Sequence, residues 1–259
     1  MRTINLTIPQ TGMDLTPRQL KAVAKFRLYS RSKRDYLVKL LSEITGLRIR
    51  RKAEADADGV NYWFRKRKEK PFVLSNWQVL NITRRLEFLA DNPGEVKPLA
   101  RLLGIRHRSP RFYGMKFEEY LEADNAFLAF VSTGKIKYLN ALCAVLYRPW
   151  WQKWSSKRLM RRGNKFSLVP RYKRHTILLW YRGFKEHART QCPHFFVKGN
   201  PESMEEVNMV EQVREMLRML NHGDVTKNEA IMQGETWDAL YELDSLAKEY
   251  NEWKKKQKK

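Results

Sequence analysis

Apolar residues recur at three- and four-residue intervals along most of the chain, which is the pattern of amphipathic helices. The clearest helix start is the Thr-Pro-Arg-Gln motif at residues 16–19, a capping box with proline at the first helical position. Ser32 and Ser75 open two further helices, and Gly46 ends the first of these. The sequence therefore predicts a mainly α, multi-helix protein.

The middle of the chain continues the helical pattern. We expect helices over residues 116–132, 136–147 and about 172–190, with Gly134 separating the first two. Residues 148–170 contain two prolines and a glycine, and we expect them to form a long loop.

Alternating polar and apolar residues predict strands in two places. One is the short run 3–9, which ends at Pro9. The other is the segment 47–74, where Asp58 and Gly59 suggest a hairpin turn between short strands. We therefore expect a small N-terminal β-element near 47–74, edged by basic residues.

The charge changes this picture, because the formal net charge of +23 is unevenly distributed. Between Asp124 and Glu186 there are 14 Lys or Arg and no acidic residue, whereas residues 202–252 hold 13 acidic and 4 basic residues. A lysine-rich tail follows. We accordingly expect a basic helical body over 1–198 and an acidic helical arm over 199–259. Such asymmetry bears on partners and solubility.

The two cysteines, Cys143 and Cys192, indicate unpaired thiols in a reducing compartment. No secretory segment and no run of about 18 apolar residues is visible, so the sequence predicts neither export nor a membrane partner.

The best candidate site is the segment 147–174, where aromatic side chains alternate with cations. Cations that neutralise phosphates, together with aromatic faces that stack on bases, are typical of single-stranded nucleic-acid binding. Two other interpretations stay open: a loop whose tryptophans pack on the core, and a surface for an acidic protein. The candidate contact residues are Arg148, Trp150, Trp151, Lys153, Trp154, Lys157, Arg158, Arg161, Arg162, Lys165, Arg171, Lys173 and Arg174.

Other motifs carry less weight. Residues 99–105 resemble the start of a helix-turn-helix, but Pro110 would break its recognition helix. His187, Cys192 and His194 lack a fourth zinc ligand within reach. The acidic residues at 118–124 are best explained as ion-pair partners of nearby arginines. We therefore expect no catalytic residue, no metal, no cofactor and no small-molecule substrate.

The acidic arm carries an apolar stripe rich in methionine. Its final helix places apolar residues at heptad spacing. The stripe is explained either by packing within the arm or by a partner or self-association surface. The candidate interface residues are Val213, Leu217, Leu220, Leu243, Leu246, Tyr250 and Trp253.

Three stretches carry a resemblance: 15–20 (Leu-Thr-Pro-Arg-Gln-Leu), 39–47, and the pair 223–227 and 236–244. In this order the chain resembles a family of uncharacterised proteins encoded in phages and prophages of gut Bacteroidetes, among virion and tail genes. The resemblance implies no catalytic residue.

Two functions are therefore expected. The first is a non-enzymatic phage virion component or tail assembly factor, acting in the host cytoplasm or in the virion. Its partners would be other phage structural proteins or further copies of itself. The alternative is a nucleic-acid-binding protein that uses the segment 147–174.

Overall fold

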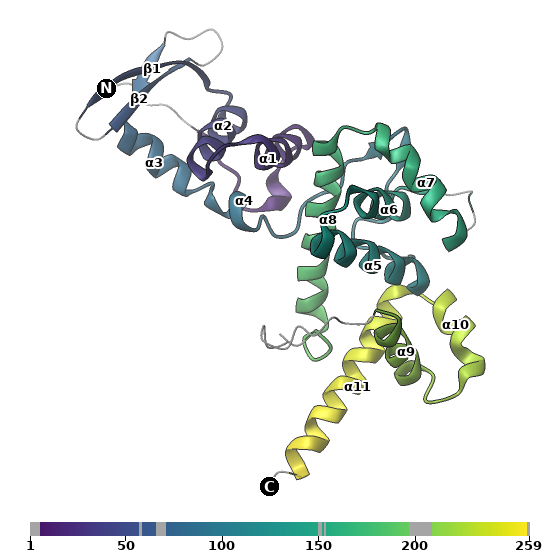
Figure 1. The fold of residues 1–259 in the computed structure, drawn as a ribbon. Helices are drawn as coiled ribbons and strands as arrows, with labels where there is room; N and C mark the ends of the chain where they lie inside the picture. The colour runs from purple at the N-terminus through teal and green to yellow at the C-terminus, as the bar shows by residue number, and fades with distance from the viewer. Residues whose placement is uncertain are drawn as a thin grey trace. The chain divides into compact units, whose positions relative to one another are not determined.

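The computed structural model describes residues 6–56, 59–65, 71–149, 152, 154–196 and 209–257 (Figure 1). Helices dominate these residues, which confirms the mainly α fold. The helices are α1 (Pro17–Tyr29), α2 (Lys33–Thr45), α3 (Asn76–Arg84), α4 (Glu87–Asp91), α5 (Phe117–Thr133), α6 (Ile136–Leu146), α7 (Leu159–Lys165), α8 (Arg171–Gln191), α9 (Met209–Leu220), α10 (Asn228–Gln233) and α11 (Thr236–Gln257). The strands are β1 (Arg48–Asp56), β2 (Gly59–Arg65), β3 (Phe72–Leu74), β4 (Arg101–Leu102) and β5 (Ile105–Arg106).

The predicted helix starts and stops are confirmed where capping residues define them. Thr16 and Ser75 each form a capping box, with Gln19 and Gln78 as the returning side chains. Gly134 ends α5 in the left-handed conformation, at a φ of 66°, which glycine adopts without a steric penalty.

The β-element expected near 47–74 is confirmed as an antiparallel sheet with the strand order β1-β2-β3. A hairpin joins β1 to β2 as predicted, but Gly59 is the first residue of β2 and pairs with Asp56, so it does not belong to the turn. Asp58 lies outside the described residues. A strand over 3–9 is wrong for residues 6–9, which take no regular structure and pair with no described strand. Residues 3–5 lie outside the described chain.

Residues 99–105, which resemble a helix-turn-helix start, instead contribute to the β4–β5 hairpin. Leu103 and Gly104 both have positive φ, 50° and 77°. Two consecutive positive φ values are typical of the tight turns that join hairpin strands.

Two helix boundaries differ from the prediction. The helix that begins after Ser75 is interrupted by a turn at 85–86, which separates α3 from α4. The expected loop 148–170 contains α7, because Leu159 and Phe166 bury their side chains at helical spacing. Gly163 faces α6: the backbone nitrogen of Ala141 lies 3.5 Å from the Cβ that a larger residue would place there, which is an ordinary van der Waals distance.

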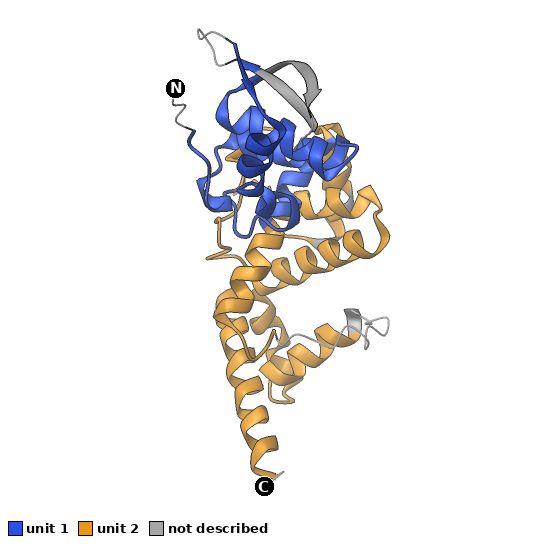
Figure 2. Ribbon diagram, turned by 90° about the vertical axis from the view of Figure 1, so that its left-hand side faces the viewer, with its two compact units in different colours: residues 1–97, 171–180 blue, residues 98–170, 181–259 orange. Residues whose placement is uncertain are grey.

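Internal contacts divide the chain into two compact units (Figure 2). Unit 1 comprises residues 1–97 and 171–180, and unit 2 comprises 98–170 and 181–259. Helix α8 supplies its first ten residues to unit 1 and the rest to unit 2. This division differs from the expected boundary between 198 and 199, and that boundary itself lies outside the described residues.

The start of α11 is packed into unit 2, which is why the acidic segment belongs with the residues around α5. The backbone N–H and the hydroxyl of Thr236 both donate to the carbonyl of Met115, at 2.8 Å each. The indole N–H of Trp237 donates to the carbonyl of Arg111 at 2.7 Å. These side chains are buried with Leu240 and the helix is therefore fixed to the unit at its N-terminal end.

Cys143 and Cys192 are both buried, and neither forms a disulfide with another described residue. Within the described chain, no helix combines the length and the apolarity that crossing a membrane requires.

Burial along α11 predicts two different outcomes for substitutions on one stripe. Leu243 is fully buried, so Leu243→Ala should lower the free energy of unfolding by about 2–5 kcal/mol. Tyr250 is 58% exposed, so Tyr250→Ala should change it by no more than about 0.5 kcal/mol. Chemical denaturation of both variants measures the difference. Equal losses would contradict the burial gradient along the helix.

Candidate nucleic-acid interface

Arg148 is the least exposed of the described candidate contact residues. It follows the last turn of α6 and is only 7% exposed. Its guanidinium group donates to a carboxylate oxygen of Glu119 on α5 and to the backbone carbonyl of Gln152. Arg148 therefore holds the start of the α6–α7 connection against α5.

Glu119 is the buried counter-ion of this group. Its side chain is fully buried, and a second guanidinium nitrogen, from Arg108, lies 3.5 Å from its other oxygen. Burial raises the pKa of Glu119, and the two arginines oppose that shift. The expected ion pairing of the acids at 118–124 with arginines is confirmed for Glu119. Asp124 pairs with a lysine instead, Lys185, at 2.7 Å.

Trp154 lies between two guanidinium groups. The carbon centre of Arg148 lies 5.6 Å from the indole ring and that of Arg162 lies 5.4 Å from it. Cation–π attraction lets the aromatic ring stabilise two like charges at close range. The ring is half-buried, so Trp154 is part of the structure of the connection and presents only part of its surface for stacking.

Arg162 completes the group from α7. It donates to the backbone carbonyl of Ser155 at 3.2 Å and to the side-chain oxygen of Gln152 at 3.4 Å. Burial, followed by repulsion from Arg148, lowers the pKa of the Arg162 guanidinium, which nevertheless stays charged at neutral pH. We call Arg108, Glu119, Arg148, Trp154 and Arg162 the buried arginine cluster.

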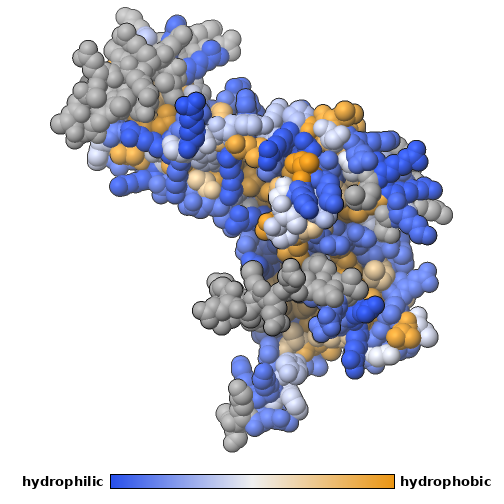
Figure 3. All heavy atoms as spheres, viewed as in Figure 1, coloured by the Kyte–Doolittle hydropathy of each residue, from blue (hydrophilic) through white to orange (hydrophobic). Residues whose placement is uncertain are grey.

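The exposed cations lie on and just before α7. Lys157, Arg158, Arg161 and Lys165 are all exposed. None of the four forms an ion pair with another residue that the structure describes. We call these four residues the α7 basic row. The surface over α7 in Figure 3 is mainly hydrophilic.

The structure groups only part of the predicted site. Trp150, Trp151 and Lys153 lie outside the described residues. Arg171, Lys173 and Arg174 belong to the part of α8 assigned to unit 1, where Arg171 is exposed and Arg174 is 8% exposed. The site in unit 2 is therefore the buried arginine cluster together with the α7 basic row.

Arg108 and Gln152 were missed by the sequence argument. The pattern gave no signal for Arg108, because 40 residues separate it from Arg148 along the chain. Gln152 lies inside the predicted segment, but its backbone carbonyl, which carries no sequence information, makes the contact with Arg148.

The predicted interface residues of the arm also differ from one another in exposure. Leu243 is buried, and Leu246 is partly exposed. Tyr250 and Trp253 are 58% and 55% exposed. On α9, the residues Val213, Leu217 and Leu220 are all partly exposed.

No three His, Cys, Asp or Glu side chains converge at metal-binding distance anywhere in the described ranges. No protein-family model, no curated protein and no solved structure matches the chain.

Trp154 provides a test of the buried arginine cluster. Trp154→Ala removes a half-buried ring and two cation–π contacts, so it should lower the free energy of unfolding by about 1–3 kcal/mol. Trp154→Phe keeps an aromatic face and should lose less. Thermal or chemical denaturation gives both values, and an unchanged stability in the alanine variant would remove the structural role of the ring.

His175 on α8 makes the stability of unit 1 depend on pH. Burial, then repulsion from Arg171 and Arg174, lowers the pKa of His175 from 6.5 to about 4. The folded chain therefore disfavours a proton that the unfolded chain accepts, and stability should be lost as the pH falls from 6.5 towards 4. His175→Gln should show a smaller loss over that window. Denaturation of both proteins across the window tests this, and parallel pH profiles would contradict it.

Proposed function

We propose that this protein is a non-enzymatic nucleic-acid-binding protein that contacts the phosphate backbone through the α7 basic row. The observation that carries the proposal is the set of four exposed cations on one short segment, with no ion-pair partner among the described residues. Phosphate contacts of this kind give affinity without sequence information.

The spacing of the α7 basic row suits a phosphate backbone. Arg158, Arg161 and Lys165 follow one another at three- and four-residue intervals, so they lie on one face. They span about 10 Å of helix axis at about 1.5 Å per residue. One strand of B-form DNA carries a phosphate about every 3.4 Å along its axis, so about three phosphates fit this length.

The buried arginine cluster adds positive charge beneath that face. It contains three guanidinium groups and one carboxylate, so it keeps an excess of two positive charges. The Nε atoms of Arg148 and Arg162 are buried, and neither finds a hydrogen-bond acceptor among the residues described. An anion placed over α7 would be attracted by this uncompensated charge, and the attraction would be stronger than in water because the cluster is partly desolvated.

A virion or tail assembly role is the second candidate. The feature that favours it is the apolar stripe of α11, which continues beyond the buried residue Leu243 to the exposed rings of Tyr250 and Trp253. Contiguous exposed apolar surface is typical of protein–protein contact sites. Its partners would be other structural proteins or further copies of the chain. Binding of nucleic acid and assembly are compatible in one protein.

Salt dependence tests the first candidate. Replacing Arg158, Arg161 and Lys165 together by Gln should weaken binding to single-stranded DNA of any sequence. Each lost phosphate contact removes about 0.7 from the slope of log affinity against log salt, so the slope should fall by about two. Fluorescence anisotropy over a salt series measures both effects.

The matched control replaces Lys25, Arg84 and Arg85 by Gln. These three cations are exposed and lie in unit 1, and replacing them lowers the net charge by as much as the α7 variant does. Affinity and slope should change less in the control than in the α7 variant. Equal effects would mean that net charge alone governs binding. No binding by the unchanged protein at low salt would refute the proposed function.

A further inference from the structure

The C-terminal part of α11 presents an apolar stripe that its own unit does not cover. Leu243, Leu246, Tyr250 and Trp253 follow the a and d positions of a heptad. Leu243 is fully buried, whereas the rings of Tyr250 and Trp253 are more than half exposed. The two rings stack on each other with their centroids 6.2 Å apart. The stripe thus begins inside unit 2 and continues along the helix into solvent.

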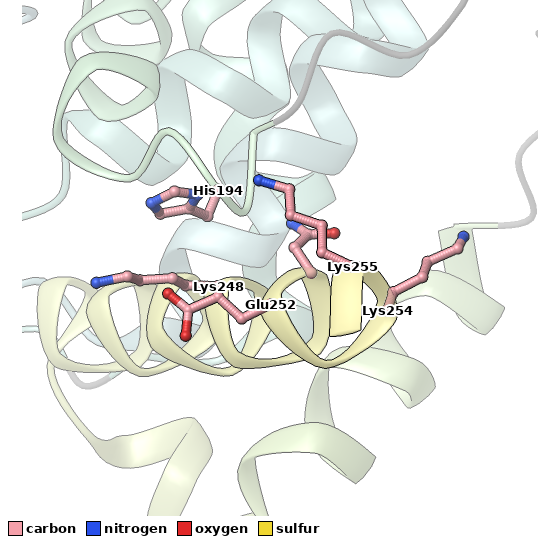
Figure 4. A pocket seen from close by; sticks show the side chains of 6 residues that line it. His194, Lys248, Glu252, Lys254 and Lys255 are labelled. Carbon is pink, nitrogen blue, oxygen red and sulfur yellow. The ribbon is translucent and has the colours of Figure 1, made fainter. Parts of the chain in front are cut away.

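The opposite face of α11 is already used within unit 2. Asp244 accepts the backbone N–H groups of His194 and Phe195 at 2.7 and 2.8 Å. Beside this contact lies a cavity of about 380 Å³, which Figure 4 shows between His194 and the side chains of Lys248 and Glu252. Figures 1 and 2 both show the last turns of α11 extending past α9. On the face opposite the stripe, α11 is therefore held at Asp244, whereas its last turns extend beyond that contact.

The charges that flank the stripe select a partner. In the heptad that places Leu243 at position a, Glu249 and Lys256 both occupy position g. Neither forms an ion pair within the described part of the chain. If two copies of this segment pack antiparallel, so that Tyr250 faces Trp253 of the second copy, the g positions of the two helices lie along the same flank. Glu249 of each copy then faces Lys256 of the other copy on that flank.

A parallel arrangement is less favourable. It would pair Glu249 with Lys254 of the second copy, but it would also place two lysine clusters, 254–256, side by side. The antiparallel arrangement instead separates the two lysine clusters and places Lys256 of each copy beside Glu249 of the other, and it aligns the two helix dipoles favourably. We propose that two copies of this protein associate through the antiparallel C-terminal ends of α11.

The size of the stripe sets the strength of this association. A fully covered Tyr or Trp side chain buries about 150–250 Å², and here roughly half of each ring is available. Two rings from each copy therefore bury well under about 1,200 Å², which is the range of weak, reversible complexes. The dimeric fraction should therefore rise with protein concentration, and this association does not depend on nucleic-acid binding.

Sedimentation equilibrium over a concentration series tests the proposal with nuclease-treated full-length protein, so that bound nucleic acid cannot bridge two copies. The mass should rise from the 31.0 kDa of one chain towards twice that value. Trp253→Glu should weaken the dimer at least about thirtyfold, the loss typical of a central tryptophan. Because Trp253 is 55% exposed, this variant should keep the melting temperature of the unchanged protein.

Charge exchanges test the orientation. Glu249→Lys alone should weaken the antiparallel dimer, and adding Lys256→Glu should restore it. Adding Lys254→Glu would restore only a parallel dimer. Lys255→Glu lies on the opposite face and is the matched control, which should leave the dimer unchanged.

A protein that stays monomeric at every concentration overturns the proposal, as does a dimer that Trp253→Glu leaves intact. Rescue by Lys254→Glu instead of Lys256→Glu overturns the antiparallel orientation.

Discussion

Glu119 is fully buried on α5, and the guanidinium groups of Arg108 and Arg148 both reach its carboxylate. Removing one partner from a buried ion pair commonly costs about 3–5 kcal/mol, so the positions of these side chains depend on one another. Arg148 also holds the carbonyl of Gln152, and Arg162 holds both Gln152 and Ser155. The path of the chain from α6 to α7 therefore follows from where one carboxylate is buried.

This arrangement separates two roles within one run of basic residues. Arg148 and Arg162 turn inward, hold backbone carbonyls and flank Trp154, whereas Arg158 and Arg161 turn outward on the same short segment. Burying guanidinium groups is costly unless their hydrogen bonds are satisfied. Here the carboxylate of Glu119, the carbonyls of Gln152 and Ser155 and the side chain of Gln152 accept from the terminal nitrogens of Arg148 and Arg162. These inward contacts fix the backbone that carries the α7 basic row. Its side chains therefore lose less conformational freedom when they bind an anion.

The sequence predicted those parts of the fold that local chemistry decides. The boxes at Thr16 and Ser75 and the glycine at Gly134 set helix ends through their own side chains and dihedral angles. Helix α7 was missed because prolines flank it, although Leu159 and Phe166 bury one face against the core. In the site, composition identified the basic segment but could not divide it into buried and exposed cations. That division depends on Arg108 and Glu119, which come from distant parts of the chain.

The two surfaces of unit 2 differ in how strongly salt weakens their contacts, and this follows from their chemistry. The α7 basic row consists of four exposed cations, so it attracts a polyanion through charge, and this attraction is screened as ionic strength rises. The stripe at Tyr250 and Trp253 is held mainly by the removal of apolar area from water, which salt does not screen. The flanking charges Glu249 and Lys256 chiefly select orientation. At high salt, therefore, only self-association through the stripe should persist, whereas at low salt both self-association and polyanion binding should be measurable. When two copies associate through the stripe, both α7 basic rows can bind the same polyanion at once. Even a weak dimer can therefore raise the overall affinity for the polyanion well above that of one copy.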